Sequence, residues 1–258
     1  MTPPVEAERQ RLRARDILAA ALHLVYPVPC HVCGRPLDLD RRSALCGACW
    51  RALERMPVEG CLRCGWPFAG PGGTRGAEAP LCQRCRETRD RFEVARAVFC
   101  YREGGIARAA ILLCKHGGRL PLLRQLADLL AQEAPAHLVL SAWDAAVPVP
   151  LHWTRRLRRG FNQAEVLALA VGRRHGLPVL RHALGRVRRT EAQHGNPGVR
   201  QANVRGAFAV SRPWQVAGRR LLVVDDVFTT GATVNACADT LLSAGALAVG
   251  VLTLARVE

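Results

Sequence analysis

Lysine is almost absent from this 258-residue chain, which takes nearly all of its positive charge from arginine. Lysine and arginine together number 37, against 21 aspartates and glutamates, and the formal net charge is +16. This charge favours polyanionic partners such as nucleic acid or phosphorylated metabolites, although an arginine-rich genome would account for part of it. Lys115 is the single lysine. Either its compact ammonium group binds a ligand that arginine would not suit, or a lysine occurs at this position by chance.

The chain also lacks an apolar run long enough to cross a bilayer. Four arginines between positions 9 and 15 precede an apolar stretch over 17–25, and this order superficially resembles a signal peptide. Asp16 and His23 break up the segment, and no Ala-x-Ala cleavage site comes before the first cysteine. We therefore predict an amphipathic helix within 1–26, no stable membrane insertion and a cytoplasmic location.

A Walker phosphate-binding loop is absent, but residues 221–233 indicate a different anion site. The unbroken apolar run from Leu221 to Val224 predicts a central parallel strand, with Asp225 and Asp226 at its carboxyl end. The turn and the helix after it, from about Thr233 to Ser243, would offer backbone N–H groups and the positive end of a helix dipole. A ribose 5-phosphate with Mg²⁺ suits both the acids and the turn. The turn residues expected to hold the phosphate are Thr229, Thr230, Gly231, Ala232 and Thr233.

Two other interpretations of the paired acids stay open. A Val-Val-Asp-Asp sequence also occurs near the start of phospho-receiver domains, but only about thirty residues follow it here. In a plain strand–turn–helix unit, the two carboxylates would simply be solvated.

The cysteines give a second strong pattern, because eight of the eleven fall into four Cys-x-x-Cys pairs. Two such pairs complete a tetrahedral structural Zn²⁺ site, so the chain is expected to bind two zinc ions. We expect sequential pairing, while an interleaved arrangement and a disulfide framework remain alternatives. The expected ligands are Cys30, Cys33, Cys46 and Cys49 for one ion and Cys61, Cys64, Cys82 and Cys85 for the other. The three remaining cysteines lie in apolar contexts and are expected to be buried.

The composition changes near residue 91, where the cysteine-rich part gives way to alternating strand and helix patterns. This alternation predicts an α/β fold, with a parallel sheet and helices on both of its faces. The predicted domains are 1–26, 27–90 and 91–258. The expected strands are 92–101, one within 137–149, 177–180, 205–210, 219–227 and 247–254, and the expected helices are 106–113, 122–132, 162–175 and 233–243.

Further candidate residues lie in three polar segments of the α/β domain. An arginine-rich loop before the helix start at Asn162 predicts an anion site, with a solvated basic face as the alternative. Residues 186–205 are polar and unpatterned, which is typical of a functional loop such as a lid. Lys115 lies in a turn between two helices, where it either faces the site or caps a helix. The arginines are Arg155, Arg156, Arg158 and Arg159.

Residues 221–233 resemble the phosphoribosyl-pyrophosphate (PRPP) signature of type I phosphoribosyltransferases. The chain as a whole resembles the ComF family, bacterial proteins tied to DNA uptake in natural transformation, with GntX-type proteins among their relatives. The resemblance depends on the order of several motifs together with the cysteine pairs. These motifs are 113–118, 148–163, Arg186-x3-Thr190-x2-Gln193, Arg200-x2-Asn203, 206–208 and 221–233.

The resemblance implies a type I phosphoribosyltransferase-like domain that follows a double zinc ribbon. In such a domain Asp225 and Asp226 contact the ribose and the turn holds the 5-phosphate, and the loop over 186–205 is the lid. The catalytic candidates are Asp225, Asp226, Arg189 and Gln193, and the candidates for the pyrophosphate side are Lys115, Arg155, Arg158 and Arg159. The implied ligands and partners are PRPP with Mg²⁺ or a related phosphosugar, single-stranded DNA and proteins of the competence machinery.

Two functions are compatible with these expectations. The first is a phosphoribosyltransferase, a glycosyltransferase whose acceptor the sequence does not identify. The second is a non-catalytic module that senses PRPP or another nucleotide, because fold alone does not separate enzymes from regulators. In that second function the zinc ribbons would bind nucleic acid or a protein, with Trp50, Trp66 and Phe68 as candidate contacts.

Overall fold

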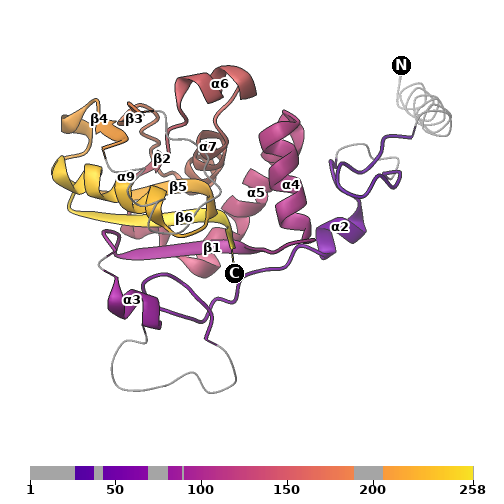
Figure 1. Ribbon diagram of the computed structural model, residues 1–258, viewed down its shortest axis with the longest axis horizontal. Coiled ribbons are helices and arrows are strands. Elements are labelled where there is room, and N and C mark those ends of the chain that lie inside the picture. The colour runs from indigo at the N-terminus through magenta and orange to yellow at the C-terminus, as the bar shows by residue number, and fades with distance from the viewer. Residues whose placement is uncertain (1–26, 38–42, 69–80, 89, 189–205, 258) are drawn as a thin grey trace, which may run out of the picture. The chain divides into compact units, whose positions relative to one another are not determined.

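The computed structural model describes residues 27–37, 43–68, 81–88, 90–188 and 206–257 (Figure 1). The chain forms two compact units, Met1–Ala52 and Leu53–Glu258, so the first cysteine group lies in one unit and the second group in the other. The domain boundaries at 26/27 and 90/91 stay predictions. The amphipathic helix expected within 1–26 lies outside the described residues.

The described part of the first unit consists of two short cysteine-bearing turns. An antiparallel bridge between Pro29 and Pro36 closes the first turn. The second turn leads into helix α2 (Gly47–Arg51), where the indole N–H of Trp50 donates to the Ser43 hydroxyl at 2.7 Å. This hydrogen bond fixes the partly buried Trp50 against its own unit.

The second unit is built on a four-stranded parallel sheet. Its strands are β1 (Val94–Tyr101), β2 (Ala145–Pro148), β5 (Arg220–Phe228) and β6 (Ala248–Val257), in the order β1-β6-β5-β2. Strands β5 and β6 are central. Strand β6 is almost wholly buried, and β5 is buried over its apolar run from Leu221 to Val224 and at Phe228. The parallel α/β fold predicted from the sequence is therefore confirmed.

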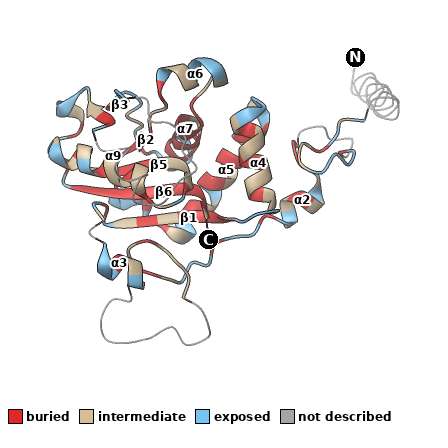
Figure 2. Ribbon diagram, viewed as in Figure 1, coloured by how far each residue is buried: buried red, intermediate tan, exposed pale blue. Residues whose placement is uncertain are grey.

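Helices cover both faces of this sheet. Helix α9 (Ala232–Ser243) packs against the face that carries Leu221, Val223 and Val251, and forms one apolar core with them. Helices α4 (Ile106–His116), α5 (Leu120–His137) and α7 (Gln163–His175) contact the sheet and are amphipathic, and α5 and α7 pack closely together. Figure 2 shows the buried positions concentrated on the sheet and on the sides of these helices that face it.

The remaining elements are short. Strands β3 (Leu184–Arg186) and β4 (Phe208–Val210) form a small antiparallel sheet, and the predicted lid residues 189–205 between them lie outside the described residues. The strand expected over 177–180 was wrong, because it is reduced to one bridge between Val179 and Ala146. Short 3-10 helices occupy Leu140–Ala142 and Pro213–Gln215, and a helical turn, α3 (Gln83–Glu87), lies within the second cysteine group.

The arginine-rich segment before α7 was expected to be a loop, but it forms helix α6 (Trp153–Arg159). Its N-cap is His152, whose ring accepts from the Thr154 N–H, and it ends at Gly160. None of its residues is buried, so it has no apolar face from which its helical state could be predicted.

We also asked whether any helix could span a bilayer. Among the described residues, none combines the length and the apolar character that a membrane crossing requires.

Candidate functional site

A cavity of about 220 Å³ opens at the carboxyl end of β5. Strand β5 contributes the two acids, α4 contributes Lys115, and the segment around α6 contributes arginines. The location follows from the fold, because the loops after parallel strands meet at this edge of the sheet. Its charged or hydroxylic lining residues are Lys115, Arg155, Arg159, Arg186, Asp225, Asp226, Thr229 and Thr233.

The two acids are held in different environments. Lys115 Nζ lies 2.9 Å from Asp226 Oδ2, in an ion pair whose side chains are 22% and 14% exposed. Burial, and then the charge of Asp226, raises the pKa of Asp225 from 3.8 to about 7. The backbone N–H of Asp226 donates to Asp225 Oδ1 at 2.8 Å and opposes part of this shift. Asp225 can therefore gain or lose a proton near neutral pH, while Asp226 already has a cationic partner.

Arginines face the acids across the cavity. Arg159 Nη1 donates to Gln163 Oε1 at 3.3 Å, but its buried Nε has no hydrogen-bond partner among the residues that the structure describes. Burial lowers the pKa of Arg159; the charge of Asp226 opposes part of this shift, and the like charges of Arg155 and Arg158 add to it. An anion bound here would satisfy the Nε–H group and relieve this repulsion.

The predicted phosphate turn connects β5 with α9. Gly231 is the N-cap of α9 and has φ +79°, a left-handed conformation that glycine adopts without strain. The Thr230 hydroxyl accepts from the Ala232 N–H at 3.4 Å, while Thr229 and Thr233 line the cavity. Backbone N–H groups in the first turn of a helix have no carbonyl partner within the helix, so the start of α9 could bind an anion.

Most of the predicted site residues are brought together by the fold. Lys115 and the acids meet in one cavity with Arg155 and Arg159, although they come from separate parts of the sequence. Arg158 instead lines a neighbouring cavity of about 260 Å³, which Lys115 and Arg159 also line. The catalytic candidates Arg189 and Gln193 lie outside the described residues.

Arg186 lines the cavity but was not among the residues expected to bind a ligand. Its guanidinium lies 5.4 Å from the centre of the Phe208 ring, and burial lowers its pKa. The sequence feature that could have identified Arg186 as a site residue is its position at the start of the polar segment 186–205.

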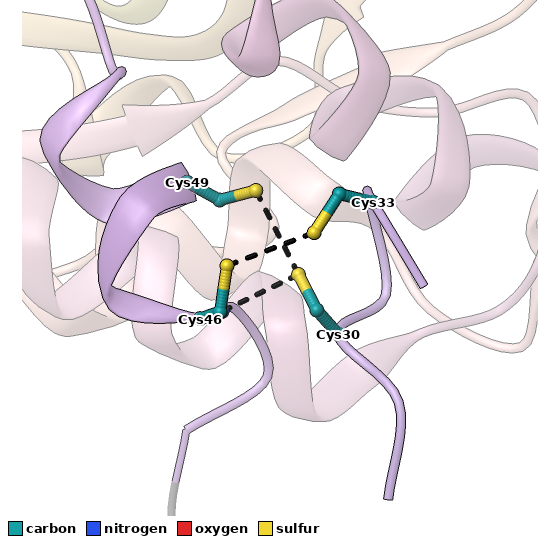
Figure 3. A group of neighbouring side chains, drawn as sticks. All are labelled: Cys30, Cys33, Cys46 and Cys49. Carbon is teal, nitrogen blue, oxygen red and sulfur yellow. Dashed lines mark hydrogen bonds between the residues drawn. The ribbon is translucent and has the colours of Figure 1, made fainter. Parts of the chain in front are cut away.

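The eight paired cysteines form two separate four-sulfur clusters, and the sequential grouping is confirmed. In the first cluster the four side chains point toward one another (Figure 3), with sulfur separations of 3.8 Å for Cys30–Cys49 and 3.6 Å for Cys33–Cys46. Zinc–sulfur bonds of about 2.3 Å in a tetrahedron place sulfurs about 3.8 Å apart. In the second cluster Cys64 and Cys82 are also 3.6 Å apart. Both clusters therefore fit a structural Zn²⁺ ion.

Backbone N–H groups favour the thiolate form of one cysteine in each cluster, Cys30 in the first and Cys61 in the second. Burial alone would raise the pKa of Cys30, but backbone N–H groups directed at its sulfur lower it to about 6. The same balance lowers the pKa of Cys61 to about 7. All eleven cysteines are free thiols, so the disulfide alternative is not realised. Cys100, Cys114 and Cys237 are buried outside the clusters, as expected.

The aromatic residues considered as docking contacts have internal roles. Trp66 and Phe68 are partly buried and pack against the second cysteine cluster. Trp66 also lies beneath the guanidinium of Arg256, at 5.0 Å from its ring centre. These packing contacts weaken the interpretation that Trp66 and Phe68 form a partner surface.

Comparison with known proteins gives a family match and several sequence relatives. A family model described as a double zinc ribbon domain matches residues 21–86. The chain is 34% identical to DNA utilization protein YhgH of Salmonella typhimurium, with 90% of this chain and 99% of that protein aligned. It is 36% identical to competence protein F of Haemophilus influenzae, over 83% and 91% of the two chains. Competence protein ComFC of Streptococcus pneumoniae is 26% identical over 83% and 88%.

Solved structures also match parts of the chain. A phosphoribosyltransferase from Corynebacterium diphtheriae is 24% identical, with a TM-score of 0.31, and the match covers 60% of this chain and 85% of that one. A glutamine PRPP amidotransferase from B. subtilis, complexed with ADP and GMP, is 21% identical, with a TM-score of 0.34 and coverage of 51% and 25%. At TM-scores this low, neither structure bears on the site.

Proposed function

Because this chain belongs to the ComF family of competence proteins, we propose that its α/β unit binds PRPP with Mg²⁺ in the handling of DNA taken up by the cell. The observation that carries the proposal is the cavity at the end of β5. There a pair of acids faces several cations beside a turn whose backbone N–H groups can hold a phosphate. A sugar phosphate with a diphosphate group presents hydroxyls and anions in this combination.

The acids, the turn and the cations of the cavity would each contact a different part of PRPP. Asp225 and Asp226 accept hydrogen bonds from the ribose hydroxyls, and the turn 229–233 holds the 5-phosphate. Lys115, Arg155 and Arg159 serve the pyrophosphate, with Arg158 from the neighbouring cavity. A Mg²⁺ ion bound with the substrate would be held by carboxylate and phosphate oxygens and would withdraw charge from the pyrophosphate.

We propose phosphoribosyl transfer as the reaction. The bond between ribose C1 and a pyrophosphate oxygen breaks, and the pyrophosphate leaves with the electron pair. An acceptor lone pair forms the new bond to C1, and the acceptor loses its proton. The cations offset the growing charge of the leaving group, and the acids stabilise the positive ribose through its hydroxyls. Arg189 and Gln193 remain candidates for closing over the sugar.

The connection with DNA comes from the relatives, whose names refer to DNA utilization and competence. The net charge of +16 is compatible with a single-stranded DNA partner. We propose that the protein works in the cytoplasm, together with competence-machinery proteins. A PRPP-sensing module would use the same cavity, and the two functions differ only in whether the bound PRPP turns over.

Calorimetry with Mg²⁺ and PRPP tests the binding site. We expect the wild type to bind, and the double variant Asp225→Asn with Asp226→Asn to lose at least tenfold in affinity, because two hydroxyl acceptors lose their charge. Asp239→Asn is the matched control, since this acid lies on α9 and pairs with the exposed Arg91 at 2.8 Å. Unchanged affinity in the double variant would remove the ribose role from the two acids.

Pyrophosphate release from PRPP separates the enzyme from the sensor. We would measure release against a panel of bases, amines and single-stranded DNA. Turnover with one acceptor identifies a transferase, and binding without turnover favours the sensing module.

A further inference from the structure

The second cysteine cluster touches the back of the phosphate turn through Arg84. This residue lies on α3 between the ligands Cys82 and Cys85. Its Nη2 donates to the backbone carbonyl oxygen of Thr230 at 2.5 Å, although 146 positions separate the two residues. Its guanidinium also lies 5.8 Å from the centre of the Phe228 ring, at the last residue of β5. The contact leaves little room, because a Cβ at Gly231 would lie 3.0 Å from Arg84 Nη2.

A second arginine joins the same cluster to the same strand end. Arg256 on β6 is buried, with only 4% of the residue exposed. Its Nη1 donates to the Cys64 carbonyl oxygen, and its Nη2 lies 3.7 Å from the Cys64 sulfur. Its guanidinium is 4.5 Å from the centre of the Phe228 ring. Phe228 therefore contacts two cations, Arg84 on the helix between two cluster cysteines and Arg256, which is hydrogen-bonded to Cys64.

A third connection reaches the first turn of α9. Asn235 Nδ2 donates to Asp90 Oδ1 at 2.5 Å, and Asn235 Oδ1 accepts from the Arg91 N–H at 2.7 Å. Asp90 in turn lies 3.8 Å from Arg84 Nη2 and 4.0 Å from the Cys85 sulfur. The strand end, the turn and the start of the helix are thus each attached to the residues around the second cluster.

Zinc is expected to hold these attachments in place. Helix α3 has only five residues, which is too short to be stable without other constraints, and two of the four cluster ligands flank Arg84. Metal ligation fixes the ends of such a segment and supplies the free energy that orders it. When the second site loses its ion, Arg84 loses its fixed position and the Thr230 carbonyl loses its charged donor. The first cluster belongs to the other unit.

From these contacts we propose that Arg84 is a positioning residue for the phosphate turn, and that zinc at the second cluster strengthens phosphosugar binding whereas zinc at the first cluster does not. The proposal rests on the proposed function, in which the turn holds the 5-phosphate. Linkage makes the effect reciprocal, so bound PRPP strengthens zinc binding at the second cluster by the same factor.

Substitution of Arg84 tests the positioning role. We expect Arg84→Ala to lower the affinity for Mg²⁺ and PRPP about tenfold, because the turn loses a hydrogen bond from a charged donor. Arg84→Lys should recover part of the loss, because it keeps a cationic donor. Arg86→Ala is the matched control, since this arginine lies on the same helix and its Nε donates to the Leu81 carbonyl at 3.0 Å. Wild-type affinity in Arg84→Ala would overturn the proposal.

Hydrogen exchange provides a readout that needs no ligand. In Arg84→Ala the backbone amides of the turn and of the start of α9 should exchange faster than in the wild type and in Arg86→Ala. Equal exchange rates in all three proteins would mean that Arg84 does not order the turn. This measurement also separates the two hypotheses. If the wild type does not bind PRPP, the proposed function fails, but faster exchange in Arg84→Ala would still support the positioning role.

Removal of one zinc ligand at a time tests the asymmetry between the clusters. We expect Cys82→Ser and Cys46→Ser each to contain about one zinc ion, and only Cys82→Ser to bind Mg²⁺ and PRPP more weakly and to show faster exchange in the turn. In the wild type, PRPP should slow the chelator-induced release of one of the two ions, and Arg84→Ala should abolish this protection. The release measurement uses the intact protein, so it decides the question even if Cys82→Ser does not fold. If PRPP binds but slows the release of both zinc ions equally, or of neither ion, the proposal is overturned.

Discussion

Replacing Asp225 with asparagine should stabilise the ligand-free protein at alkaline pH and weaken ligand binding at the same time. Burial and the neighbouring charge of Asp226 raise the pKa of Asp225 from 3.8 to about 7. Between those two values the folded state keeps a proton that the unfolded chain has lost. The free energy of unfolding therefore falls as the pH rises through this range.

The size of the effect follows from the shift. About three pH units at 1.36 kcal/mol per unit give about 4 kcal/mol as the largest stability loss from ionising Asp225. Asparagine carries no charge, and its side-chain oxygen can still accept from the Asp226 N–H, as Oδ1 does at 2.8 Å. Asp225→Asn should therefore remove up to about 4 kcal/mol of pH-dependent destabilisation at pH 8 and change little at pH 4.

Urea denaturation of the ligand-free protein between pH 4 and pH 8 checks this expectation. The wild type should lose stability toward pH 8, and Asp225→Asn should show a flatter profile. Asp239→Asn should follow the wild type, because Asp239 is exposed and pairs with an exposed arginine. Calorimetry on the same proteins should show weaker PRPP binding only in Asp225→Asn. A variant that loses both stability and affinity would refute the reasoning, because the carboxylate would then be a structural group.

Three further outcomes are expected. Metal analysis should find two zinc ions per chain, and a metal-free folded protein would end the zinc interpretation. Gly231→Ala should destabilise the protein by about 1–2 kcal/mol more than Gly104→Ala in thermal unfolding, because both glycines have positive φ but only Gly231 places a Cβ 2.9 Å from a Phe228 ring carbon. Lys115→Met should weaken PRPP binding about tenfold in calorimetry, with partial recovery in Lys115→Arg, since it removes a cation 2.9 Å from Asp226.

The sequence predicted the parts of the fold that leave a local pattern. Strand β5 was expected because its apolar run has no polar interruption, and the two zinc clusters were expected from the spacing of the cysteines. Helix α6 was missed because its stability does not come from a buried face, and Leu157 on it is 76% exposed. A strand was expected over 177–180, but this segment forms only an isolated bridge, between Val179 and Ala146.

The candidate site was predicted less completely, because its geometry depends on which elements meet. Lys115 stands out in the sequence as the single lysine, but nothing in the local sequence places this α4 residue next to Asp226 on β5. Arg84 and Arg256 do not stand out in this way, because the chain contains many arginines. Their hydrogen-bond partners lie 146 and 192 positions away in the sequence.

The same limitation applies to the two zinc clusters, which look equivalent in the sequence. Each has two Cys-x-x-Cys pairs, and together they match one double zinc ribbon family. The structure separates them, because the second cluster belongs to the α/β unit and is hydrogen-bonded to the residues that support the phosphate turn. Under the proposed coupling, a metal ion that orders a short helix beside a ligand-binding turn strengthens ligand binding. Two chemically identical sites in one ribbon can therefore differ in function because of the residues that surround them.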